Sequence, residues 1–158
     1  MEILTSRNTR GPRFLTKKMP KEYLAFQLYL DCMQKKEGKF SQKDFYSFYK
    51  NKNIKVFCDH HGIAIASYLE DECELYFLGV KNNQKRLGHG TKILKNLIIS
   101  SKALGSRKIF LEVNITNEAA LQLYINAGFK RLGVRKEYYK NSFNSFDDAI
   151  LMELLLIC

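Results

Sequence analysis

QKRLGHGTKILKNLI, residues 84–98, decides the fold, because it joins a predicted strand to a predicted helix through a short glycine loop. The residues before the loop are rich in the β-branched and aromatic types that favour strands. After Gly90, apolar residues recur at helical spacing. This order of elements predicts a strand, loop, helix, strand crossover at the centre of a sheet.

The glycine loop has the chemistry of an anion site. The first N–H groups of a helix have no acceptor within it, and the helix dipole adds partial positive charge there. Gly88 and Gly90 remove side chains that would keep a phosphate away from those amides. The surrounding cations are Lys85, Arg86 and Lys92. The loop alone also fits a plain strand-to-helix turn that needs two glycines, and both interpretations stay open.

Outward from the loop, the pattern predicts a mixed α+β fold. Residues 54–80 read as three antiparallel strands with turns at 59–62 and 70–72. Helices are predicted at 20–34 and, from a Ser41–Asp44 capping box, at 41–49. The elements after the loop are helix 91–104, strand 108–113, helix 117–127 and strands 130–138 and 147–156. We expect a mixed, mostly antiparallel sheet with helices on both faces.

The composition limits the classes of function. The chain has 158 residues, 46% of them hydrophobic, which suits one domain over residues 1–158 with a basic start at 1–19. Its net charge of +10 predicts an anionic partner: nucleic acid, a phosphate-rich cofactor or an acidic protein. No apolar run is long enough to cross a bilayer, and the four cysteines form no C-x-x-C pair. We expect a cytoplasmic protein with reduced thiols and no membrane partner.

Two residues after the loop interrupt their local patterns. Glu112 breaks the apolar strand KIFLEV, which is expected at the centre of the sheet with both faces covered. A carboxylate there is functional, as a general base, or is paired with a nearby lysine at the strand's open end. Tyr124 lies about 200° around its predicted helix from Gln122, so it faces the core. Its hydroxyl needs a partner, for which a backbone carbonyl is the common alternative to a catalytic role.

The segment Lys85-Arg86-Leu87-Gly88-His89-Gly90 resembles the [QR]-x-x-G-x-[GA] motif of the GNAT superfamily of acyl-CoA-dependent N-acyltransferases, with lysine in the first position. LEVNITNEAALQLYINAGF, residues 111–129, is similar almost position by position to the ribosomal-protein-alanine N-acetyltransferases of that superfamily. So are EDECELYFLGV, residues 70–80, and RKEYYKNSFNSFDDAILMEL, residues 135–154. The resemblance covers the chain from about Phe40 onward and implies a GNAT-like fold.

The same resemblance implies acetyl-CoA as co-substrate, no metal, and a role for each matching residue. Glu112 would deprotonate the amine through water, and Tyr124 would protonate the departing thiolate. Tyr138 and Tyr139 would lie near the acceptor. Backbone N–H groups at an irregular strand end near Val80 would stabilise the oxyanion. The cofactor would contact Leu78, Val80, Lys85, Arg86, Leu87, Gly88, His89, Gly90, Thr91 and Asn117.

Three functions remain open. The first is acetylation of the N-terminal α-amine of alanine in a ribosomal protein. The second is the same chemistry on lysine, a polyamine or another small amine, although a cationic substrate would call for an acidic cleft. The third is a non-catalytic ribosome- or RNA-binding module acting through Lys92, Lys95 and Lys102, which we interpret as a solvated helix face. No specific nucleic acid is predicted, because the aromatic-plus-basic RNA-binding motif is missing.

The histidines predict no metal site. CDHH, residues 58–61, has ligand-type side chains but lies on a predicted turn without a second ligand pair at a matching distance. His89, between the two glycines, is interpreted as a loop side chain near phosphate and not as a catalytic base.

Overall fold

The fold is described from a computed structural model that covers residues 21–33, 40–141 and 143–156. The basic start at 1–19 and both predicted ends of the first helix, Pro20 and Gln34, lie outside the described residues. The elements are α1 (Lys21–Cys32), α2 (Gln42–Lys50), β1 (Ile54–Cys58), β2 (Gly62–Leu69), β3 (Glu72–Val80), η1 (Asn82–Gln84), α3 (His89–Ala103), β4 (Lys108–Asn114), α4 (Glu118–Asn126), β5 (Lys130–Lys140) and β6 (Phe146–Leu155).

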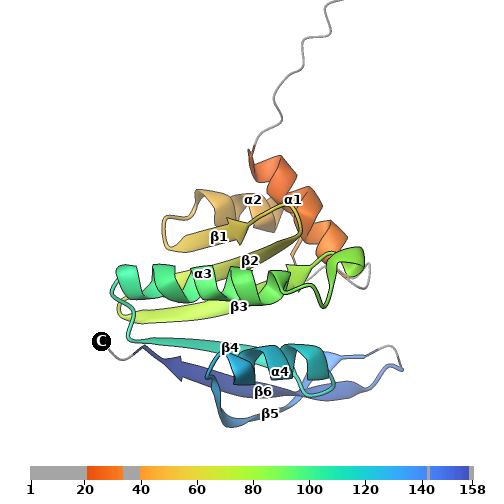
Figure 1. The fold of residues 1–158 in the computed structure, drawn as a ribbon. Coiled ribbons are helices and arrows are strands. Elements are labelled where there is room, and N and C mark those ends of the chain that lie inside the picture. Colours follow the sequence, from red (N-terminus) through yellow and green to blue (C-terminus); the bar gives the residue numbers. More distant parts are fainter. Residues whose placement is uncertain (1–20, 34–39, 142, 157–158) are drawn as a thin grey trace, which may run out of the picture.

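The strands form one six-stranded sheet in the order β1-β2-β3-β4-β6-β5 (Figure 1). β3 and β4 are parallel, and every other neighbouring pair is antiparallel. A parallel pair needs a long crossover, which α3 supplies. The predicted mixed sheet with a central strand, loop, helix, strand crossover is confirmed, with small shifts at the ends of the elements. In the described part of the chain, no helix is long and apolar enough to cross a membrane.

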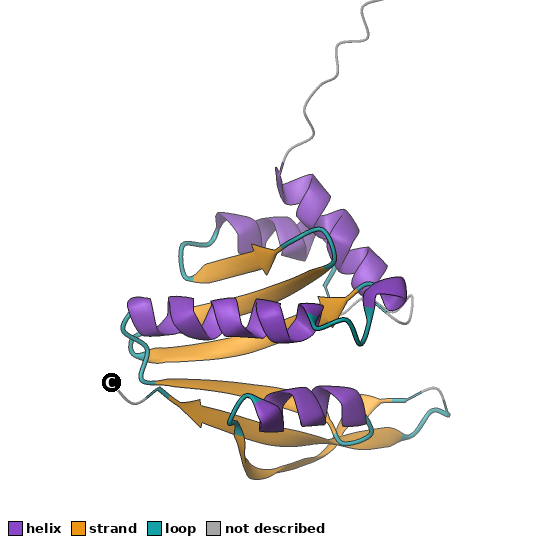
Figure 2. Cartoon of the chain, viewed as in Figure 1, coloured by secondary structure: helices purple, strands orange, loops and turns teal. Residues whose placement is uncertain are grey.

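Helices lie on both faces of the sheet, as predicted (Figure 2). α3 and α4 cover one face, over a core that includes the β4 residues Ile109, Leu111 and Val113. On the other face, α1 and α2 pack mainly on β1, β2 and β3. The expectation that both faces of KIFLEV are covered is therefore wrong, because burial alternates along β4. Phe110 and Glu112 point to the face that α1 and α2 leave partly open.

β3 and β4 separate toward their carboxyl ends. Their ladder runs only from Glu72 and Lys108 to Leu75 and Leu111, although both strands continue beyond it. Because α3 and α4 follow these two strands, the helix N-termini begin at the same end of the sheet (Figure 1). Ligands of crossover units bind outside the carboxyl ends of such strands.

A bulge in β3 coincides with this separation. Ile65 and Ala66 are consecutive in β2 but pair with residues two apart in β3, which leaves Tyr76 as the extra residue. The strand irregularity expected near Val80 therefore lies at Tyr76, and Val80 itself pairs with Gly62. A bulge bends a strand and increases its twist, and this turns β3 away from β4.

The predicted capping box of α2 is confirmed. The Asp44 backbone N–H donates to Ser41 Oγ at 3.2 Å, and the Ser41 backbone N–H donates to Asp44 Oδ2 at 3.1 Å. The cap starts the helix so that Phe45 points into the aromatic cluster under α1. Since α2 also forms one wall of a pocket described below, its start affects the position of that wall.

Replacing Ser41 by alanine should lower the free energy of unfolding by about 1 kcal/mol, because one N–H at the helix start loses its acceptor. Urea unfolding followed by circular dichroism measures this change. Ser47→Ala is the matched control, since Ser47 is exposed within the same helix and should change stability by less than about 0.5 kcal/mol. Equal losses in the two variants would mean that the capping box does not stabilise α2.

Candidate active site

The loop before α3 is built from two residues with left-handed backbone. Arg86 has a φ of +62°, and Gly88, the N-cap of α3, has a φ of +84°. A Cβ placed on Gly88 would meet no atom within 4 Å. Glycine is therefore favoured at position 88 by backbone conformation, since a left-handed residue with a Cβ costs about 1 to 2 kcal/mol.

Gly90 differs from Gly88 in its surroundings. It lies inside α3, and a Cβ there would face Leu123, Val80 and Leu78 at 3.5 to 3.8 Å. Its missing side chain thus points toward β3 and α4. These distances are ordinary contacts, so alanine also fits, which explains a motif that accepts glycine or alanine at this position.

The start of α3 presents free backbone donors. The Lys92 N–H donates to the Gly88 carbonyl at 3.0 Å and forms the first intrahelical bond. The N–H groups of His89, Gly90 and Thr91 precede it and have no acceptor within the helix. Together with the helix dipole, they make a cradle that fits a diphosphate.

A groove of about 620 Å³ lies between α3 and α4 on the same face. Its polar lining includes Arg86, Thr91 and Lys95. On the α4 side, the Gln122 amide donates to Asn126 Oδ1 at 2.8 Å, and both residues line the groove. Lys95 was interpreted as part of a solvated face, but it adds a cation to this groove. The sequence signal for the α4 side was the i, i+4 spacing of Gln122 and Asn126.

The other predicted cofactor residues lie around this groove in different ways. Lys85 follows η1 directly, and Leu87 is 66% exposed in the loop. Asn117 has a structural role as the N-cap of α4, because its Oδ1 accepts the Ala120 N–H at 3.2 Å. Asn117 thereby starts α4 at the end of the sheet where α3 also starts.

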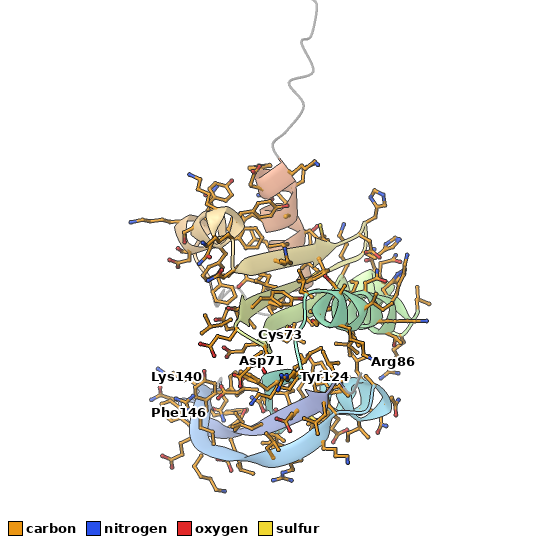
Figure 3. All side chains as sticks on the ribbon, turned by 90° about the vertical axis from the view of Figure 1, so that its left-hand side faces the viewer. Asp71, Cys73, Arg86, Tyr124, Lys140 and Phe146 are labelled. Carbon is orange, nitrogen blue, oxygen red and sulfur yellow. The ribbon has the colours of Figure 1, made fainter. Side chains whose placement is uncertain are left out.

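A second pocket, of about 350 Å³, lies on the opposite face, where α2 packs. Glu112 of β4 and Tyr138 of β5 line it, together with Glu74 and Tyr76 of β3 and Phe48 of α2. The groove therefore lies on one face of the sheet and the pocket on the other, and both are next to the point where β3 and β4 separate. Figure 3 shows the two sides: Arg86 lies with α3 and α4, whereas Lys140 and Phe146 lie across the sheet.

Glu112 and Tyr138 line this pocket, and Tyr139 contacts the Glu112 backbone beside it. Arg135 Nη1 donates to Glu112 Oε1 at 3.2 Å, and the Glu112 side chain is 27% exposed. The Tyr139 hydroxyl donates to the Glu112 backbone carbonyl at 3.2 Å, and its ring centroid lies 4.9 Å from that of Tyr138. Glu112 is thus a paired carboxylate, as one interpretation proposed, but its partner is arginine and not lysine.

The two tyrosines are held as neutral phenols. Burial raises the pKa of Tyr138, the hydrogen bond and charge of Glu112 raise it further, and Arg135 opposes them. Burial, followed by the charge of Glu112, raises the pKa of Tyr139 to about 12. Both hydroxyls therefore keep their protons through the neutral range.

Tyr124 of α4 is buried in the core on the face that α3 and α4 cover, whereas Glu112 points to the other face of β4. It is 6% exposed, and its ring packs 5.6 Å from that of Phe129. Burial raises its pKa, and Tyr139 adds to the shift. Within the described ranges its hydroxyl has no hydrogen-bond partner, so the core tyrosine bonded to a carbonyl is not observed.

The histidine turn is organised by hydrogen bonds. Asp59 Oδ1 accepts the backbone N–H groups of His61 and Gly62 at 2.8 and 3.0 Å. The His61 ring lies 4.2 Å from that of His89, so this turn packs against the glycine loop. Among the residues that the structure describes, no three His, Cys, Asp or Glu side chains are grouped to hold a metal ion.

The two glycines should respond in opposite directions to alanine. Gly88→Ala should lower the free energy of unfolding by about 1 kcal/mol or more through left-handed strain. Gly90→Ala should leave it unchanged or raise it by up to about 1 kcal/mol, because alanine favours the helix interior. Urea unfolding of both variants beside the parent chain tests this, and a larger loss at position 90 would contradict the geometry.

Comparison with known proteins identifies the family of the chain. Residues 24–129 match the model of the Acetyltransferase (GNAT) family. The "[Ribosomal protein bS18]-alanine N-acetyltransferase" of Salmonella typhimurium is 31% identical over 73% of this chain and 80% of its own length. The crystal structure of the ribosomal-protein-S18-alanine N-acetyltransferase from Escherichia coli superposes with a TM-score of 0.77 and 25% identity, over 87% of this chain and 88% of that one. A Bacillus subtilis acetyltransferase in complex with CoA shares the fold, with a TM-score of 0.65 and 15% identity over 85% of this chain and 93% of that one. The chain therefore belongs to the GNAT acetyltransferase family.

Proposed function

We propose that the protein transfers the acetyl group of acetyl-CoA to the N-terminal α-amine of alanine on a ribosomal protein in the cytoplasm. The separation of β3 from β4 carries this proposal, because it joins an anion-binding groove on one face to an acidic pocket on the other. The names of the relatives support the choice of acceptor, since those proteins modify alanine of bS18.

Acetyl-CoA fits the face that carries α3 and α4. The free amides of His89, Gly90 and Thr91 would hold its diphosphate, and Arg86 and Lys95 would supply positive charge in the groove. Residues 76–80 of β3 continue past the last pair with β4, so their edge is open toward the separation. The acyl arm would follow this edge toward Glu112.

The transfer needs one base and one acid. The amine nitrogen forms a bond to the thioester carbonyl carbon, and the carbon–sulfur bond breaks. Glu112, from the pocket face, would accept the proton that the amine loses, through water. Tyr124, from the opposite face, would give its proton to the thiolate as the carbon–sulfur bond breaks. The placement of the two residues on opposite faces suits reactants that arrive from opposite sides.

The chemistry favours an α-amine over lysine. At pH 7, removing the proton from an α-amine of pKa ~7.8 costs about 1 kcal/mol, whereas a lysine of pKa ~10.4 costs about 4.6 kcal/mol. Glu112 is paired with Arg135, so the pocket does not offer it as an isolated negative charge to a lysine ammonium. A single carboxylate base therefore suits the first amine better.

The first test uses two peptides with acetyl-CoA and mass spectrometry. One peptide has a free N-terminal alanine and no lysine, and the other has a blocked N-terminus and an internal lysine. We expect one acetyl group on the first peptide alone, and a loss of rate on the order of 10²-fold or more in Glu112→Gln.

The control for this variant is the Kd of acetyl-CoA, which should not change, because Glu112 lies on the other face from the groove. Acetylation of the lysine peptide alone would exclude the proposed acceptor. Acetyl-CoA binding without transfer to either peptide would exclude catalysis on a free α-amine.

The role of Tyr124 is tested by Tyr124→Phe, which keeps the ring and removes only the hydroxyl. We expect kcat to fall on the order of 10²-fold or more, with little change in stability, since no described residue bonds that hydroxyl. Tyr68→Phe is the matched control, because the Tyr68 hydroxyl is hydrogen-bonded to Ser101 Oγ at 3.1 Å in the core. That variant should lose about 1 kcal/mol of stability and keep its kcat. The reverse pattern would remove Tyr124 from the mechanism.

A further inference from the structure

Arg135 contacts two residues of the proposed acceptor pocket. Its Nη1 donates to Glu112 Oε1 at 3.2 Å, and its Cζ lies 4.1 Å from the centroid of the Tyr138 ring. We propose that Arg135 is a positioning residue for acetyl transfer, which holds the Glu112 carboxylate and the Tyr138 ring as one unit at the mouth of the pocket. This inference rests on the proposed function of Glu112.

Arg135 lies directly before a bulge in β5. Arg135 pairs with Ala149 of β6, and Tyr139 pairs with Asp147, so three residues of β5 oppose the single residue Asp148. The Asp148 carboxylate holds the bulge, because it accepts the Glu137 N–H at 3.0 Å and binds Lys136 Nζ at 2.7 Å.

The bulge has a consequence for the side chains around Glu112. Glu137 adopts a φ of +51° within it, which turns the chain so that Tyr138 lies against the guanidinium. The next residue, Tyr139, donates to the Glu112 backbone carbonyl. Arg135 directly before the bulge, and Tyr138 and Tyr139 at its end, thus all contact the same residue of β4, Glu112.

Arginine is suited to this position by its shape. A planar guanidinium can stack on an aromatic ring and donate an N–H to a carboxylate at the same time, whereas a lysine ammonium is a point charge without that fork. Glu112 needs such a constraint, because its side chain is partly exposed on the uncovered face of β4. A base displaced by about 1 Å from the reacting amine can lose on the order of 10²-fold in rate.

Stability does not explain the contact. The Arg135 side chain is 56% exposed, and ion pairs at such sites contribute about 0 to 1 kcal/mol. If the pair is purely structural, removing Arg135 should lower the free energy of unfolding slightly and should lower kcat no more than that loss of stability explains. A positioning residue should affect kcat far more than stability, and only while the carboxylate that it positions is present.

The test compares Arg135→Gln and Arg135→Lys with the parent chain on the alanine peptide. We expect Arg135→Gln to lower kcat on the order of 10- to 100-fold, with KM for acetyl-CoA and Tm unchanged. Arg135→Lys keeps the positive charge but lacks the planar guanidinium that stacks on Tyr138. Its kcat should therefore lie between those of Arg135→Gln and the parent chain. A kcat within about twofold of the parent for Arg135→Gln would overturn the inference.

A double-mutant cycle separates positioning from a general effect on the fold. In a Glu112→Gln background, Arg135→Gln should cause little further loss, because the group that it positions is already gone. Full additivity of the two losses would overturn the inference. Arg107→Gln is the matched control, since Arg107 pairs with Asp71 at 3.3 Å, is 83% exposed and precedes the other end of β4. It should leave kcat unchanged.

The two proposals fail in distinguishable ways. A parent chain that acetylates the alanine peptide, with a kcat that does not depend on Arg135, would overturn the positioning role and leave the proposed function standing. A parent chain that binds acetyl-CoA but acetylates neither peptide would overturn both.

Discussion

The early end of the ladder between β3 and β4 is the constraint on which the rest of the site depends. Two parallel strands at the centre of a sheet would normally exclude a ligand, because their edges bond to each other. Here the bulge at Tyr76 turns β3 away after Leu75, and the two strand edges part beyond it. The opening joins the two faces of the sheet at the end where both crossover helices begin. A cofactor and an acceptor can thus meet there from opposite sides.

The two faces carry different chemistry. The face under α3 and α4 offers backbone donors and cations, which suit the phosphates of acetyl-CoA. The face beside α2 offers Glu112 with a shell of tyrosines whose pKa values are raised by burial and by the Glu112 charge. This division follows from the alternation of β4, which points its apolar residues to one side and Glu112 to the other. The net charge of +10 is consistent with capture of an anionic cofactor, although charge alone does not choose among anionic partners.

Several parts of the site could be predicted from local sequence because their causes are local. The glycine motif before α3, the start of α4 near Asn117 and the inward direction of Tyr124 depend on neighbours a few residues away. The role of Gly90 could not be predicted in this way, since its missing side chain faces residues of β3 and α4. The pairing of Glu112 with Arg135 was also hidden, because the two residues are 23 positions apart and meet only through β6.

By itself, the sequence determined the order of the elements, the mixed sheet and the family, because periodicity, caps and glycine motifs act over short distances along the chain. Only the tertiary structure decided where the sheet opens, which face of β4 stays uncovered and which cation holds Glu112. These features depend on strand register and on bulges at Tyr76 of β3 and in β5. A bulge leaves little trace in the hydrophobic pattern, yet it moves every later side chain of its strand relative to the neighbouring strand.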